Sequence, residues 1–174
     1  MRRNAVTLPF ATSAGILVVF LNGLIRDCDA QSTYEKIYGT PLYDVANSME
    51  TTADHGFILV GLSGAVFDTC NSDFALVKCD ADGTIQWTQT YKTPACDQGL
   101  GIKQTPDHGY LATGVMIDTP SISKMVLLKT DSTGQIEWQY FYSSNDHDEG
   151  IEVYPVTNNE YLIPGYRYDL NHFE

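Results

Sequence analysis

The chain has 174 residues, of which 43% are apolar and 11% aromatic; this suffices for one modest globular domain and excludes a disordered chain. Its 22 acidic residues outnumber 10 basic ones, which gives a formal net charge of -12. Nucleic acid is excluded as a partner because a phosphate backbone is held by clustered Lys and Arg, which the sequence lacks; the same charge disfavours anionic membrane surfaces.

The first 30 residues read as a targeting segment. Arg2 and Arg3 precede an uncharged apolar run over residues 14–21, and Cys28-Asp29-Ala30 offers small residues at the spacing that a signal peptidase reads. We therefore predict a signal peptide over residues 1–30, cleaved after Ala30, and a secreted, cell-surface or periplasmic chain over residues 31–174 with no membrane span. A retained anchor is the alternative, because Leu24-Ile25 extends the apolar run.

An internal repeat dominates the remaining sequence. Asp54-His55-Gly56-Phe57 returns 53 residues later as Asp107-His108-Gly109-Tyr110. The segment over residues 76–87, with its Lys-x-Asp turn and final Trp87, returns 51 residues later over residues 127–138. A fainter third copy covers residues 159–165. Two blocks that match in both order and spacing indicate duplicated structural units.

Each copy divides into four strand-like runs separated by tight turns. In the second copy these runs are residues 99–105, 110–115, 124–130 and 135–142. Four antiparallel strands in 51–53 residues is the period of a β-propeller blade. The fold class is therefore all-β, with blades over residues 44–91, 97–142 and an incomplete 148–174. Small residues in the first strand suit the place where blades converge, and the alternating fourth strand suits the outer edge.

The repeat resembles those of secreted bacterial β-propeller proteins, which often carry a C-terminal sorting domain for type IX secretion. The segment Lys129-Thr130-Asp131-Ser132-Thr133-Gly134-Gln135-Ile136-Glu137-Trp138 also resembles the tryptophan-docking motif of quinoprotein propellers. The resemblance implies that Trp87 and Trp138 pack between adjacent blades. The sequence departs from the pattern of this group in two ways. It has His55 and His108 where a second Gly is usual, and no sorting domain is seen.

Two blades and half of a third are fewer than the 4–8 blades that close a propeller. We expect the chain to be the N-terminal part of a longer protein that supplies the remaining blades; a short open array is the alternative.

Candidate sites for metal or catalysis are weak. Asp80-Ala81-Asp82-Gly83 could begin a calcium loop, but a plain hairpin turn is favoured because Asp and Gly are the usual turn residues. The repetition of His55 and His108 is better explained by a shared turn. No catalytic, cofactor-binding or metal-ligating residue is predicted. Calcium is the one cofactor that the sequence leaves open.

Topology places the longer connections, after strands two and four, on one face of the domain. This loop face is the expected contact surface for a protein or carbohydrate ligand, with five carboxylates as candidates: Asp68, Asp97, Asp118, Asp146 and Asp148. The same face holds Cys70 and Cys96, for which a disulfide is predicted, whereas Cys79 lies at the far end of its strand and is expected to be a free thiol.

The sequence therefore favours an exported, non-enzymatic binding or adhesion scaffold. Part of a propeller enzyme, either a quinoprotein-like oxidoreductase or a glycan-active enzyme, stays as the alternative, since fold alone does not decide function.

Overall fold

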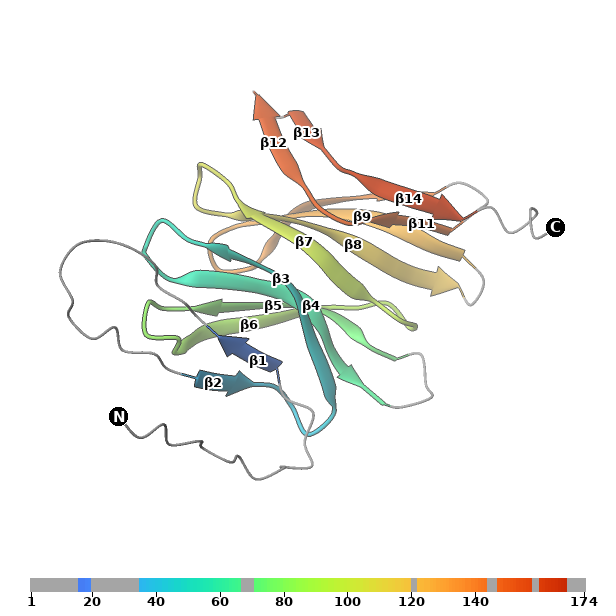
Figure 1. Ribbon diagram of the computed structural model, residues 1–174. Coiled ribbons are helices and arrows are strands. Elements are labelled where there is room, and N and C mark those ends of the chain that lie inside the picture. The colour runs from blue at the N-terminus through green and yellow to red at the C-terminus, as the bar shows by residue number, and fades with distance from the viewer. Residues whose placement is uncertain are drawn as a thin grey trace, which may run out of the picture.

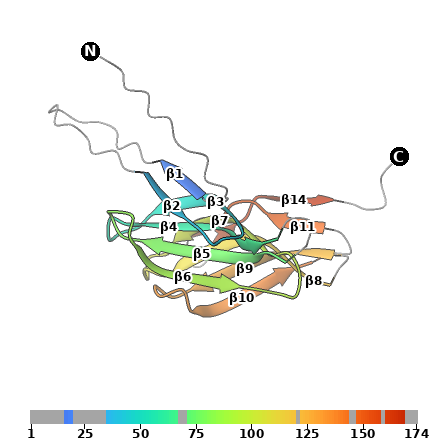
Figure 2. The same cartoon turned by 90° about the horizontal axis from the view of Figure 1, so that it is seen from below.

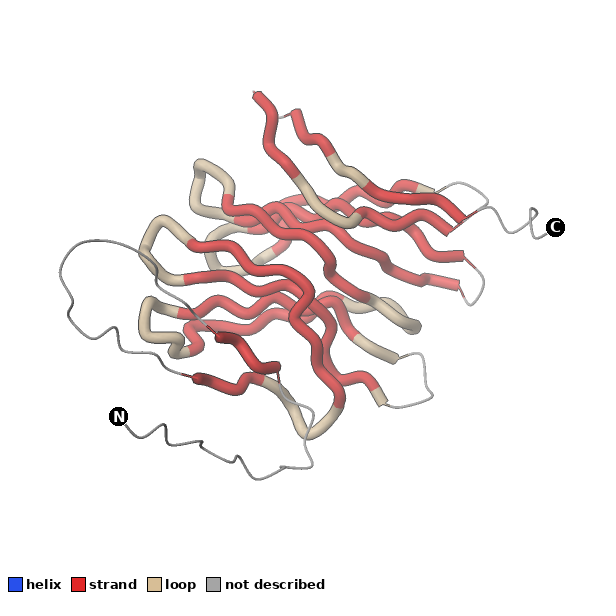
Figure 3. Tube along the Cα trace, viewed as in Figure 1, coloured by secondary structure: helices blue, strands red, loops and turns tan. Residues whose placement is uncertain are grey.

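The computed structural model describes residues 16–19, 35–66, 71–119, 122–143, 147–157 and 160–168. All regular elements in this part of the chain are β-strands (Figure 3). They form a stack of antiparallel sheets in chain order, with the N-terminal strands at one end and the C-terminal strands at the other (Figure 1).

Two four-stranded sheets match the first two predicted blades. Each runs from strand one to strand four without a crossover, as the turn chemistry predicts. The first sheet contains β3 (Tyr43–Thr51), β4 (Phe57–Ala65), β5 (Asp73–Cys79) and β6 (Ile85–Tyr91). The second contains β7 (Gln98–Gln104), β8 (Tyr110–Thr119), β9 (Ile122–Thr130) and β10 (Ile136–Tyr142). The prediction of antiparallel four-stranded units is confirmed.

The third unit consists of two interrupted strands. One comprises β11 (His147–Gly150) and β12 (Tyr154–Thr157), and the other comprises β13 (Glu160–Leu162) and β14 (Gly165–Tyr168). β11 pairs with β14 and β12 with β13. The break falls at Pro164, which has no N–H for the ladder, although its carbonyl still accepts from the Ile151 amide at 2.9 Å.

A short hairpin covers the other end of the stack. β1 (Ile16–Val19) pairs antiparallel with β2 (Glu35–Tyr38), and Figure 2 shows this hairpin beside the first sheet. Residues 16–19 belong to the segment for which a signal peptide is predicted, and here they form a strand.

The main core lies between the two complete sheets. Alternate residues of β4, β5, β8 and β9 point into this layer, and their intervening neighbours point to the opposite faces. The layer contains Ile58, Val60, Phe74, Leu76, Ile102, Tyr110, Ala112, Val126 and Leu128. Because the second sheet is covered on both faces, its middle strands are apolar on both, which explains the unbroken apolar run at residues 126–128.

The first strands of neighbouring units approach closely. A Cβ added to Gly99 would lie 2.2 Å from a methyl group of Val60, and one added to Gly101 would lie 2.5 Å from the Cα of Glu152. The small residues predicted for the innermost strand are therefore required by the spacing of the sheets.

Candidate functional site

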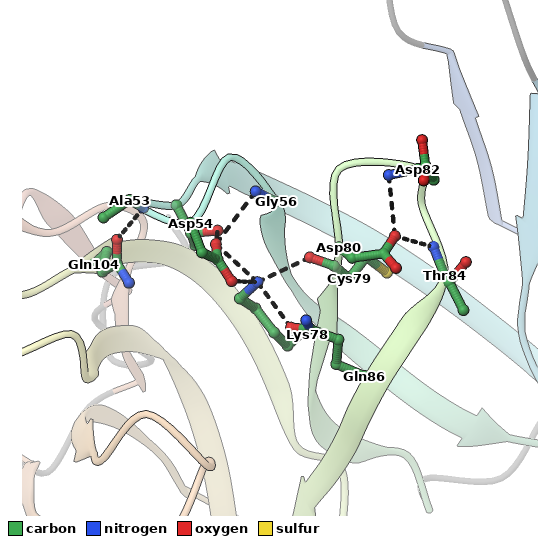
Figure 4. Close-up of polar contacts among 11 residues, drawn as sticks. Ala53, Asp54, Gly56, Lys78, Cys79, Asp80, Asp82, Thr84, Gln86 and Gln104 are labelled. Carbon is green, nitrogen blue, oxygen red and sulfur yellow. Dashed lines mark hydrogen bonds and ion pairs between the residues drawn. The ribbon is translucent and has the colours of Figure 1, made fainter.

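The repeated Asp-His-Gly turn is held by a buried lysine from strand three (Figure 4). Lys78 Nζ donates to Asp54 at 2.8 Å, to the Cys79 carbonyl at 2.9 Å and to Gln86 Oε1 at 3.1 Å. Asp54 also accepts from the Gly56 amide at 3.2 Å. The turn between strands one and two is thus fixed to the end of strand three by one ammonium group.

The second sheet repeats this network with an additional carboxylate. Lys129 Nζ donates to the Thr130 carbonyl at 2.9 Å, to Glu137 at 2.8 Å and to Asp107 at 2.9 Å. A side chain at Gly109 is excluded, because its Cβ would lie 2.2 Å from the Thr130 backbone carbonyl oxygen. The recurrence of Asp, Gly and Lys in the sequence is therefore explained by a structural network.

The two turn carboxylates titrate at unusually low pH. Burial acts to raise the pKa of Asp54, but hydrogen bonds from Lys78, Thr52 and the Gly56 amide outweigh it and lower the pKa to about 2. Hydrogen bonds from Thr105 and Lys129 likewise lower the pKa of Asp107 to about 2. Both groups are ionised at neutral pH and serve as counter-charges.

His55 and His108 occupy the left-handed region, each with φ of 64°. This conformation favours Gly. The shared turn conformation accounts for the repetition of these histidines.

A carboxylate ties each inter-sheet connection to the sheet that follows it. Asp44 accepts from the Thr40 amide at 2.6 Å, from Ser63 Oγ at 2.6 Å and from the Gly64 amide at 3.1 Å. Asp97 plays the same part at the next junction.

Asp97 accepts from the Thr93 amide, from Thr93 Oγ1 at 2.8 Å and from the Ile117 amide at 3.1 Å. Its side chain is fully buried, and burial raises its pKa even though these hydrogen bonds oppose the shift. For Asp44, the hydrogen bonds outweigh burial and lower the pKa.

This arrangement does not fit the prediction that Asp97 and Asp148 contact a ligand. Both are buried, and Asp148 accepts from Arg167 Nε at 2.7 Å. Their oxygens are used within the fold, because a carboxylate removed from water needs donors around it. Asp68 and Asp146 lie outside the described residues, and so does the side chain of Asp118.

The two tryptophans each contact the unit that follows them. Trp87 meets Tyr110 edge-on with ring centroids 5.7 Å apart, and Trp138 lies 6.2 Å from Tyr161. A Cβ on Gly134 would lie 2.9 Å from the Trp87 ring. Both indoles are intermediate in exposure, since each lies towards the outer edge of its sheet.

The cysteines divide as their positions predict. Cys96 is disulfide-bonded, and Cys79 is a buried free thiol beside the Asp80 turn, where burial raises its pKa. The predicted partner, Cys70, lies outside the described residues, so the Cys70–Cys96 pairing stays a prediction.

The candidate calcium loop is built as a turn. One oxygen of Asp80 accepts from the Asp82 amide at 3.0 Å and from the Thr84 amide at 2.8 Å, and Asp131 repeats this pattern with Thr133 and Gln135. Within the described ranges, no group of three or more His, Cys, Asp or Glu side chains is arranged to hold a metal ion.

One repeated motif was missed by the sequence reasoning. Tyr-x-Thr-Pro-x-x-Asp occurs at residues 38–44 and again at 91–97. Its Tyr hydroxyls donate to the next unit, from Tyr38 to the Gly83 carbonyl and from Tyr91 to the Gly134 carbonyl, both at 2.6 Å. The Thr-Pro that both copies share between the Tyr and the Asp is the signal that would have revealed this junction motif.

Comparison with known proteins adds no family assignment: no family model matches the chain, and neither does any curated protein. Among the residues described, no helix has the length and apolar character needed to cross a membrane.

Proposed function

We propose that the chain is part of an exported, non-enzymatic binding or adhesion scaffold built from propeller-type repeats, and that it holds a protein or carbohydrate ligand at its loop face. The observation that carries the proposal is the use of the repeated polar residues within the fold. Asp54, Lys78 and Asp97 each bond to neighbouring groups of the same chain, and their counterparts do the same at other repeats.

The loop face supplies the variation that a binding surface needs. Tight turns of nearly the same sequence close the opposite face, whereas the connections after strand two differ between copies, and the connection at residues 143–148 lacks the Thr-Pro shared by residues 39–44 and 92–97. Asp73, where the connection after strand two ends, forms an ion pair of 3.3 Å with Lys92, where the connection after strand four begins, and Lys92 is exposed. Variable connections on a rigid scaffold are the usual place for ligand contacts.

A paired set of substitutions tests the proposal. Purified chain is applied to immobilised glycans and extracellular proteins, and Asp118→Asn with Asp146→Asn is compared with Asp82→Asn on the turn face. We expect the loop-face change to weaken binding at least about tenfold, the effect of about 1.4 kcal/mol, and the turn-face change to leave it intact. Equal effects from both faces, or turnover of a bound glycan, would contradict the proposal.

Export is tested by N-terminal sequencing of protein recovered from outside the cytoplasm. The expected first residue is Gln31. Recovery of a chain that still begins at Met1 would favour the retained anchor.

A further inference from the structure

A groove of about 920 Å³ lies between the outer half of the second sheet and the third unit. Its walls are mainly apolar and aromatic, and include Leu127, Trp138, Tyr140, Tyr142, Val156 and Tyr161. The strands that form it are β9 and β10 on one side and β12 and β13 on the other.

The equivalent surface of the first sheet is filled. There, β6 presents Trp87, Gln89 and Tyr91 at the positions that Trp138, Tyr140 and Tyr142 occupy on β10. The hairpin of β9 and β10 covers them: Tyr91 Oη donates to the Gly134 carbonyl at 2.6 Å, and a Cβ on Gly134 would lie 2.7 Å from Gln89.

The exposure of the tyrosine at the end of strand four shows whether a neighbouring hairpin covers this surface. Tyr38 is 6% exposed and Tyr91 is 8% exposed, and each donates to the turn glycine of the next unit. Tyr142, at the same position of the second sheet, is 46% exposed. In the described part of the third unit, strands one and two are present, and the groove lies where strands three and four stand in the other sheets.

We propose that the groove is the acceptor site for a β-hairpin of the repeat's own third-and-fourth-strand type, supplied by a further part of the same polypeptide. This inference rests on the proposed function, in which the chain belongs to a longer repeat protein. The hairpin's first strand pairs along the side of β13 and β14 that no described strand occupies, and its aliphatic residues, at the positions of Val126 and Leu128, pack on Trp138. Its turn glycine offers a carbonyl to Tyr142.

The test adds this hairpin to the chain as it exists. A labelled synthetic peptide of residues 122–142 is titrated into the full chain, and binding is followed by fluorescence anisotropy. We expect one peptide per chain. Tyr142→Phe in the chain weakens binding about 5–10-fold through the lost hydrogen bond, whereas Tyr43→Phe, an exposed tyrosine outside the groove, does not.

A peptide variant tests the turn. Gly134→Val in the peptide should abolish binding. In the chain, Gly134 has φ of 81° and its Cβ would meet the Trp87 ring; the corresponding ring for the bound peptide is that of Trp138. Where the free peptide aggregates, the chain is extended after Tyr168 with a copy of residues 118–142. The extended chain should then melt at a higher temperature than the same extension carrying Val at the turn.

Three results overturn the inference. The first is equal peptide affinity for the wild-type and Tyr142→Phe chains. The second is an equal melting temperature for the two extended chains. The third is self-association of the chain that Tyr142→Phe abolishes, which would assign the groove to a second copy. Failure of the proposed function is distinguishable, because the loop-face substitutions change none of the residues given as lining the groove and are read by ligand binding.

Discussion

At the scale of single residues, the buried lysines determine how stability responds to acid. Lys78 and Lys129 are almost completely shielded from solvent, yet their carboxylate partners differ in number. Among the described residues, Lys78 has Asp54 as its carboxylate partner, whereas Lys129 has both Asp107 and Glu137. A buried ammonium left without a counter-charge is costly, so the two networks should respond unequally to the same change.

We predict that Asp54→Asn lowers the free energy of unfolding by about 2 kcal/mol and Asp107→Asn by about 1 kcal/mol, values kept small because both carboxylates are half exposed. The pKa values of Asp54 and Asp107 are lowered from 3.8 to about 2, so their stabilisation is complete above about pH 4 and is lost as pH falls towards 2. Urea unfolding at several pH values checks both points. A wild-type stability that stays constant between pH 4 and 2 would contradict the assignment.

The histidines in the left-handed turns store strain. Replacing His55 or His108 by Gly should raise the free energy of unfolding by about 0.5–1 kcal/mol, because the relief of left-handed strain exceeds the entropy cost of Gly. The matched change to Ala keeps the Cβ and should not stabilise. Thermal melts of the four variants decide this, and a destabilising His55→Gly would indicate that the imidazole makes a contact worth more than the strain.

At the scale of strands, the outer strand four of each sheet adds an aromatic contact to the next unit. Trp87 packs on Tyr110 and beside Gly134 of a complete sheet, whereas Trp138 packs on Tyr161 of a two-stranded unit. The two tryptophans therefore occupy the same strand position but pack against neighbouring units of different size.

We predict that Trp87→Ala costs about 3 kcal/mol, the lower end for a large aromatic because the indole is half-buried, and that Trp138→Ala costs less. This ordering follows from the completeness of the neighbouring unit. Denaturant midpoints measured side by side would test it. If Trp138→Ala shifts the midpoint more than Trp87→Ala, the third unit is better packed than its two strands indicate.

At the scale of the whole molecule, stability should decrease from the centre of the stack towards the third unit. β4, β5, β8 and β9 contribute to the main core, while β12 and β13 expose Tyr154, Val156 and Leu162. We predict that amides of β12 and β13 exchange with deuterium faster than those of β4 and β8, because local opening costs less where few apolar contacts are lost. Uniform protection across all strands would mean that the third unit unfolds only with the rest.

The sequence predicted the strand order and the small residues of strand one, because periodicity and turn residues act locally. The third unit was harder: Pro164 interrupts its second strand, and Pro155 lies within β12 beside a shift of register. The positions of Asp97 and Asp148 were predicted, but not their role. A carboxylate in a loop looks the same whether it faces solvent or accepts three hydrogen bonds, and the difference depends on distant partners such as the Ile117 amide and Arg167.

The tyrosine-to-glycine bond at each junction has a geometric consequence. Tyr38 with Gly83 and Tyr91 with Gly134 are bonds of the same length between corresponding positions, so two successive junctions are fixed by the same contact. Each unit therefore meets the next through groups that the repeat itself supplies, and the contact at one junction does not depend on how many units the chain holds.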